Sequence, residues 1–129
     1  QAKYKAMEEH EVRFEKFDCD DAEYLIVAYG SSARISQKAV QLARAKGIKA
    51  GLFRPITLFP FPKKEINALA SRVKGILAVE MSAGQMIEDI QLAVAGKVNA
   101  QHFGRYGGVI PAPDEVVEAL EQLISGGSK

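Results

Sequence analysis

Two polar residues in the middle of the chain could take part in chemistry. Glu80 ends the apolar stretch Gly75–Val79, and Gln85 opens the next helical pattern, directly after Gly84. In an open α/β sheet, ligands and partners meet the carboxyl ends of the strands, so both side chains are expected at one rim. Glu80 could act as a general base, but nothing nearby in the sequence would tune it for that task. We therefore favour hydrogen bonding of both residues to a neighbouring loop or domain.

A second candidate is the turn formed by Gly30, Ser31 and Ser32, which joins an apolar run to a helical pattern. Backbone N–H groups and the helix dipole make such a turn a possible anion site. A plain helix cap explains the same residues and is the favoured interpretation. The sequence contains no GxGxxG and no P-loop pattern, so it does not support nucleotide binding.

A third candidate is the glycine-rich segment around Arg105, with Gly107 and Gly108 after it. Glycines allow the backbone to approach a ligand closely, and an arginine can clamp a phosphate or a carboxylate. A solvated surface arginine is an equally good interpretation. A further segment, residues 55–62, combines three prolines with Leu58 and two phenylalanines, and we favour an interface there.

The remaining reactive residue types exclude several kinds of site. Cys19 is the only cysteine, so the chain cannot form an internal disulfide or supply four ligands to an iron–sulfur cluster. Acidic neighbours should raise the pKa of the Cys19 thiol, which argues against a nucleophile. His10 and His102 make no zinc pattern. We therefore predict no catalytic residue and no metal ligand in this chain.

Composition narrows the class of protein further. The 129 residues are 47% hydrophobic and 26% charged, with a net charge of +1, which is typical of one globular domain. Scattered basic residues do not suggest a nucleic-acid or membrane-surface partner, and no apolar stretch approaches a membrane span. With no signal peptide at the start of the chain and a single cysteine, a cytoplasmic setting is expected.

After residue 22, apolar runs alternate with helical patterns, which predicts a parallel sheet flanked by helices. Strands are expected at residues 24–29, 50–54, 75–80 and 98–103, and helices at about 32–46, 63–73, 85–95 and 114–125. Spacings in the opening 17 residues favour a helix first, and Val12–Phe17 fits either a helix or a short strand. We expect a helix or linker from a preceding domain over 1–21, the domain proper over 22–125 and a tail over 126–129.

Four segments in order resemble the thiamine-diphosphate-dependent 2-oxoacid:ferredoxin oxidoreductases. They are Tyr29-Gly-Ser31, Gly51-Leu-Phe-Arg-Pro-Ile-Thr-Leu-Phe-Pro-Phe-Pro62, Val79-Glu-Met-Ser-Ala-Gly-Gln-Met86 and Gly104-Arg-Tyr-Gly-Gly108. The likeness covers about Asp20 to Leu123, in the C-terminal, transketolase-like region of the alpha-type subunit. Glu80-Met-Ser82 resembles the 2-oxoisovalerate (2-ketoisovalerate, branched-chain) type, whereas asparagine more often replaces Ser82 in the 2-oxoglutarate type.

The resemblance implies a three-layer α/β/α fold like the C-terminal domain of transketolase, with a mostly parallel five-stranded sheet and one antiparallel strand. The fifth strand could lie in Val12–Phe17. It also implies a parent enzyme that uses thiamine diphosphate, magnesium, an iron–sulfur cluster and coenzyme A, and that reduces ferredoxin. No cofactor is expected on this chain itself. Its expected role is a non-catalytic interface with the preceding pyrimidine-binding thiamine domain and other subunits.

Three other interpretations stay open at this point. A stand-alone flavodoxin-like or receiver-like binding module would share the alternating pattern, although the acidic cluster of a receiver and the aromatic pair of a flavodoxin are missing. A pyruvate- or 2-oxoglutarate-specific member of the same family, or a transketolase-like enzyme that uses no ferredoxin, would share the fold.

Overall fold

The computed structural model describes residues 4–9, 12–28, 31–56, 62–80, 85–103 and 112–126. One mixed sheet forms the centre, in the order β1-β2-β4-β3-β5-β6. The strands are β1 (Tyr4–Glu9), β2 (Val12–Phe17), β3 (Tyr24–Ala28), β4 (Ala50–Pro55), β5 (Gly75–Val79) and β6 (Asn99–Phe103). The helices are α1 (Ser31–Ala45), α2 (Lys63–Ala70), α3 (Gln85–Val94) and α4 (Pro113–Gly126).

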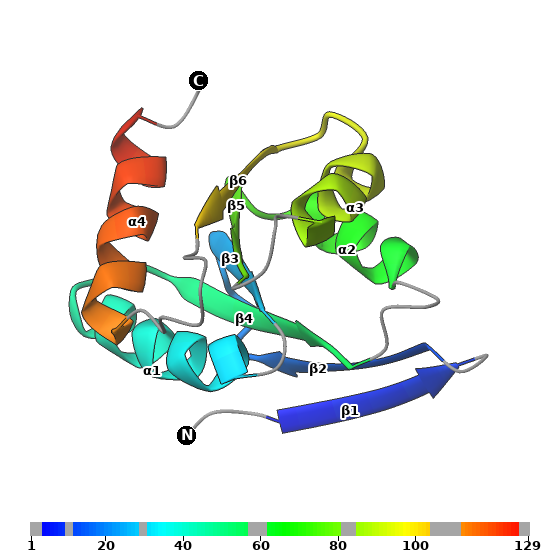
Figure 1. The fold of residues 1–129 in the computed structure, drawn as a ribbon, viewed down its shortest axis with the longest axis horizontal. Helices are drawn as coiled ribbons and strands as arrows, with labels where there is room; N and C mark the ends of the chain where they lie inside the picture. The colour runs from blue at the N-terminus through cyan, green and yellow to red at the C-terminus, as the bar shows by residue number, and fades with distance from the viewer. Residues whose placement is uncertain are drawn as a thin grey trace.

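The helices cover the two faces of the sheet in pairs, which gives the expected three layers. Figure 1 shows α1 beside α4 and, apart from them, α2 beside α3. One buried cluster joins the sheet to α2 and α3, and its largest members include Phe53 and Ile66. The other cluster joins the sheet to α1 and α4 and includes Leu52 and Leu120. Because Leu52 and Phe53 are neighbours in β4, their side chains point to opposite faces.

The central strands form where the sequence predicts them, because their apolar runs are buried on both faces. β3 pairs in parallel with β4 on one side and β5 on the other, and β5 pairs in parallel with β6. The predicted helix stop is also confirmed: Gly47 follows α1 with φ +89°, a conformation that glycine adopts without strain. Leu42 lies at the border of the apolar stripe of α1 and is 36% exposed.

The amino-terminal segment corrects one prediction. Tyr4–Glu9 is strand β1 and not a helix, and it forms an antiparallel hairpin with β2. The three-residue spacing between Tyr4 and Met7 covers less than one helical turn, so it carries little weight against cross-strand pairing. In the hairpin these residues lie opposite Phe17 and Phe14. Nothing in the structure tests the predicted boundary at residue 22, although β1 and β2 belong to the same sheet as the rest.

β2 is the fifth strand that the resemblance implies, in the segment that could supply it. It pairs antiparallel with β4, so β2-β4-β3-β5-β6 is a mostly parallel sheet with one antiparallel strand. β1 adds a sixth strand at the edge. Phe14 packs the hairpin against the core. It is 2% exposed, and its ring stacks on that of Phe53 with the ring centroids 5.0 Å apart.

Candidate functional site at the carboxyl edge of the sheet

The strand order creates one special position at the carboxyl edge, between β3 and β5. The chain leaves β3 for α1 on one face of the sheet and leaves β5 for α3 on the other. Open α/β sheets bind ligands at such a reversal of strand order. Among the described residues, Ser32 and Glu80 lie here, and both side chains are almost completely buried, with 2% exposure each.

Ser32 connects the start of α1 to the end of β5. Its hydroxyl donates a hydrogen bond to the Val79 carbonyl oxygen, with 3.1 Å between the two oxygens. The prediction placed Ser32 in a turn that caps the helix or binds an anion. The structure places Ser32 in the first turn of α1, with its hydroxyl bound to the neighbouring strand, and capping or anion binding by this turn stays a prediction.

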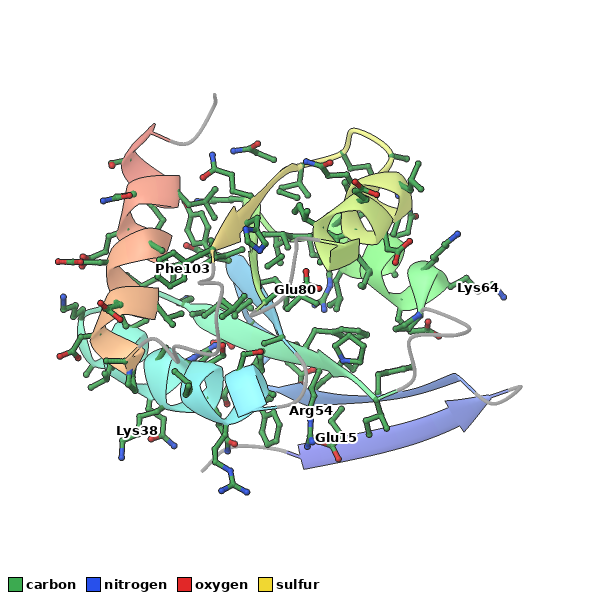
Figure 2. The ribbon with its side chains drawn as sticks, in the orientation of Figure 1. Glu15, Lys38, Arg54, Lys64, Glu80 and Phe103 are labelled. Carbon is green, nitrogen blue, oxygen red and sulfur yellow. The ribbon has the colours of Figure 1, made fainter. Side chains whose placement is uncertain are left out.

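Glu80 continues β5 by one residue. Its backbone N–H donates to the Phe103 carbonyl oxygen at the end of β6, with 3.1 Å between nitrogen and oxygen. Figure 2 labels both residues and shows Glu80 in the interior, between the two pairs of helices. A carboxylate that is 2% exposed does not face bulk water, so the expected contact with the surrounding protein suits the observed burial better than a role as an exposed base.

The other residues of the predicted rim are only partly described. Ser31 and Gln85 are the first residues of α1 and α3, so both stand at the carboxyl edge, but their side chains are not among those described. Several predicted residues lie outside the described segments altogether: Gly30, Gly84, Arg105, Gly107, Gly108, and Leu58 with the phenylalanines 59 and 61.

Among the residues that the structure describes, two buried polar side-chain atoms have no hydrogen-bond partner. They are the hydroxyl of Ser36, one turn after Ser32 in α1, and Nε2 of His102 in β6. Ser36 is completely buried in a helix face made otherwise of small and apolar residues. No group of three His, Cys, Asp or Glu side chains suited to a metal ion occurs in the described segments.

Cys19 is as unsuited to nucleophilic chemistry as predicted, but for a different main reason. Burial raises the pKa of its thiol to about 11, while Lys16 and Arg72 oppose the rise and the acidic neighbour Asp20 adds only a small part. The thiol donates to the Leu52 carbonyl oxygen at 3.3 Å. The pKa of the thiol is therefore raised mainly by burial, and not mainly by the acidic neighbours that the sequence suggested.

Sequence reasoning missed a set of ionic contacts away from this edge. Arg44 of α1 donates to the carbonyl oxygens of Ala50 (2.8 Å) and Asp18 (2.9 Å) and to the Asp21 carboxylate (2.8 Å). The paired guanidinium lowers the pKa of the Asp21 carboxyl. These bonds fix the turn between β2 and β3 at the opposite, amino edge of the parallel strands. Positions 18, 44 and 50 have no regular spacing in the sequence, so the contacts of Arg44 could not have been predicted from it.

A second missed contact joins the hairpin to β4. Glu15, 7% exposed, lies opposite Arg54 in the register of β2 and β4, and the guanidinium binds its carboxylate at 3.0 Å. Figure 2 labels this pair beside β2. A buried carboxylate needs such a partner, because removing the positive group would leave its charge uncompensated.

Comparison with known proteins identifies the family of this chain. A family model described as pyruvate:ferredoxin oxidoreductase core domain II matches residues 22–116. The chain belongs to this family. A stand-alone flavodoxin-like or receiver-like module is thereby set aside.

Curated relatives of this domain II chain include oxidoreductase subunits of Methanothermobacter species. It is 45% identical to ketoisovalerate oxidoreductase subunit VorB of Methanothermobacter thermautotrophicus. The 128 aligned residues are 99% of this chain and 36% of that relative. It is 35% identical, over 104 residues, to 2-oxoglutarate synthase subunit KorA of the same organism, covering 81% of this chain and 28% of that one. The chain thus spans about a third of the length of these relatives.

Solved structures confirm the fold of this domain II. A split-gene transketolase matches with a TM-score of 0.73 at 15% identity, over 82% of this chain and 39% of that one. The 2-oxoglutarate:ferredoxin oxidoreductase of Magnetococcus marinus, solved with 2-oxoglutarate, coenzyme A and succinyl-CoA bound, matches with a TM-score of 0.68 at 17% identity, over 96% of this chain and 20% of that one. The transketolase-like fold is as predicted. In the described part of the chain, no helix is long and apolar enough to cross a membrane.

Proposed function

We propose that this chain is the non-catalytic interface domain of a 2-oxoacid:ferredoxin oxidoreductase that acts on 2-oxoisovalerate. The parent reaction would convert the 2-oxoacid and coenzyme A into an acyl-CoA and carbon dioxide, with reduction of ferredoxin. The observation that carries the proposal is the 45% identity to a ketoisovalerate oxidoreductase subunit over almost the entire chain. A cytoplasmic setting is part of the proposal, because a single free cysteine suits a reducing compartment.

The identities favour the branched-chain substrate. Two ketoisovalerate oxidoreductase subunits match at 45% and 46%, over 99% and 95% of this chain. Two 2-oxoglutarate synthase subunits match at 35%, over 78% and 81% of it. A 2-oxoglutarate-specific parent enzyme is therefore the second candidate, and the same assay separates the two.

An architectural role suits the chemistry of the described residues. Ser32 and Glu80 stand where an open α/β sheet would hold a ligand, yet both are only 2% exposed. The Ser32 hydroxyl donates its hydrogen bond to the Val79 carbonyl oxygen. Buried polar groups of this kind are better suited to stabilising the carboxyl edge of the sheet than to binding a small molecule. The preceding thiamine domain, and other subunits of the complex, are the partners that we propose for this edge.

One group that the family implies, an iron–sulfur cluster, does not fit this chain. An iron–sulfur cluster needs about four thiolate ligands, and the chain has one cysteine, buried with a pKa raised to about 11. We therefore assign the cluster and the electron transfer to ferredoxin to other parts of the parent enzyme, and we propose that thiamine diphosphate and magnesium are bound there as well. The isolated chain should accordingly form no acyl-CoA.

The test is an assay of the native complex that contains this chain, purified without oxygen. Coenzyme-A-dependent reduction of a viologen dye would be measured with 2-oxoisovalerate, 2-oxoglutarate and pyruvate. A clear preference for 2-oxoisovalerate in kcat/KM supports the proposal, whereas a preference for 2-oxoglutarate favours the second candidate. If no 2-oxoacid reduces the dye, although thiamine diphosphate and clusters are retained, the oxidoreductase assignment is wrong.

A further inference from the structure

The paired helices α1 and α4 present charges of opposite sign on one outer face of the domain. α1 contains three basic residues and no acidic one, whereas α4 contains four acidic residues and no basic one. The two helices lie side by side on the same face of the sheet (Figure 1). We call their outer surface, which carries the exposed side chains of Arg34, Lys38, Asp114 and Glu118, the α1/α4 face.

The four charges of the α1/α4 face have no opposite charge beside them. In the part of the chain that the structure describes, none of the four belongs to an ion pair. The contact between the two helical segments lies elsewhere, where Lys46, the residue after α1, binds the Glu121 carboxylate at 3.1 Å. Figure 2 labels Lys38 and shows its side chain pointing away from the sheet. Charges of both signs are therefore available to a partner.

The rules of helix stability do not account for the positions of these charges. Arg34 and Lys38 stand four residues apart in α1, on one side of the helix, and like charges at this spacing repel each other. Asp114 and Glu118 have the same spacing in α4. Arg34 also stands in the first turn of α1, where the helix dipole favours a negative charge. Opposite charges on another molecule would offset the repulsion within both helices.

We propose that the α1/α4 face binds a second copy of this chain. A two-fold contact can place α1 of each copy against α4 of the other, so that both basic pairs meet acidic pairs. A partner of one sign, such as a nucleic acid, would be attracted by one helix and repelled by the other. A second copy complements both helices at once. This inference does not rest on the proposed function, because it concerns only the surface of this chain.

The size of the α1/α4 face sets the strength of the contact. Helices of 15 and 14 residues, each about 22 Å long and about 10 Å wide, cover roughly 450 Å² on each copy. Stable complexes bury about 800 Å² on each partner, so the dimer should be weak, with a Kd on the order of 100 μM. Salt screens exposed charges, so the association should also depend on ionic strength.

Sedimentation equilibrium of the 129-residue chain tests the association. Between about 10 μM and about 1 mM chain, in about 50 mM NaCl, the average mass should rise from that of a monomer toward that of a dimer. In about 500 mM NaCl the association constant should be at least about tenfold lower, because the charges are then screened. A monomer at every concentration in low salt overturns the inference, and so does a dimer that is indifferent to salt.

Charge reversal tests whether the α1/α4 face makes the contact. Arg34→Glu with Lys38→Glu leaves both helices of the face acidic. Asp114→Lys with Glu118→Lys leaves the exposed charges of both helices basic. Each double variant alone should stay a monomer, because its two helices now repel those of a second copy. An equimolar mixture of the two should form a heterodimer with a Kd within about threefold of the unmodified chain's, since each α1 then meets an α4 of opposite charge.

The matched control reverses exposed charges on the opposite face of the sheet. Lys64→Glu with Glu88→Lys changes one charge of each sign on α2 and α3, and it should leave the Kd unchanged. Circular dichroism checks the fold of each variant. If a reversal variant does not fold, Arg34→Gln with Lys38→Gln should still lower the association constant at least about threefold. A reversal variant that dimerises alone like the unmodified chain, or a folded mixture that stays monomeric, contradicts the assignment of this face.

Discussion

Two buried serines one turn apart in α1 should respond to the same substitution with opposite signs. Ser32 donates to the Val79 carbonyl oxygen, whereas the Ser36 hydroxyl is buried without any partner. An intramolecular hydrogen bond contributes about 1 kcal/mol to stability, and an unpartnered buried hydroxyl costs about 1–3 kcal/mol. Ser32→Ala should therefore destabilise the chain by about 1 kcal/mol, and Ser36→Ala should stabilise it by about 1 kcal/mol after allowance for the small void.

The pair is informative because other effects are shared. Both changes remove one oxygen from a buried position of the same helix. With an unfolding entropy of about 2.1 cal/mol/K per residue for 129 residues, 1 kcal/mol shifts Tm by about 4 °C. The two variants should then melt about 8 °C apart, on either side of the unmodified chain.

The assay is thermal and urea denaturation of the three chains, followed by circular dichroism. Equal urea m-values would show that the substitutions change stability and leave the compactness of the unfolded state as it was. If Ser36→Ala melts lower than the unmodified chain, the hydroxyl has a partner after all. If Ser32→Ala does not melt lower, the bond to Val79 contributes nothing to folding. Either result would refute the reasoning.

Three more substitutions test other parts of the fold. Arg44→Met should lose about 2 kcal/mol of stability in urea denaturation, because two backbone carbonyls lose their charged donor, whereas Asp21→Asn should lose much less, since that carboxylate is exposed; equal losses would contradict this. Gly51→Ala should lower the free energy of unfolding by about 1–3 kcal/mol in the same assay, because the new Cβ would lie 2.8 Å from the Asp18 carbonyl oxygen. An unchanged urea midpoint would show that the turn at Asp18 moves aside without cost. The pKa of Cys19 is raised from 9.0 to about 11, so the folded state holds this proton more tightly, and stability falls as pH rises from 9 to 11. Between pH 9 and 11 the loss should be about 2 kcal/mol greater than in Cys19→Ser, and parallel pH profiles of the two chains would argue against it.

The parts of the fold that could be predicted are those whose signal is local. β3 and β5 are continuous apolar runs, and the stripes of the helices repeat at helical spacing, so their burial follows from the order of residues alone. β1 could not be predicted, because its residues become a strand through pairing with β2 and not through their own pattern. Leu42 repeats at the same helical spacing in α1 yet is 36% exposed, and the spacing alone does not distinguish it from its buried neighbours Ala39 and Ala43.

The candidate site shows the same division. That Glu80 and Ser32 stand at one edge followed from strand ends and the order of elements. That Ser32 bonds to Val79, 47 residues away, depends on which strands are neighbours, and no spacing encodes it. The ion pair between Glu15 and Arg54 could not be predicted for the same reason, because the register between β2 and β4 brings the two residues opposite each other.

The central claim is that the domain is necessary to the parent enzyme although it performs no chemistry itself. The most direct measurement is viologen reduction with 2-oxoisovalerate by the complex with residues 22–125 present, by the complex without them, and by the isolated chain. We predict activity only where the domain is present and none from the chain alone. Undiminished kcat in the complex that lacks the domain, or acyl-CoA formation by the isolated chain, would contradict the claim.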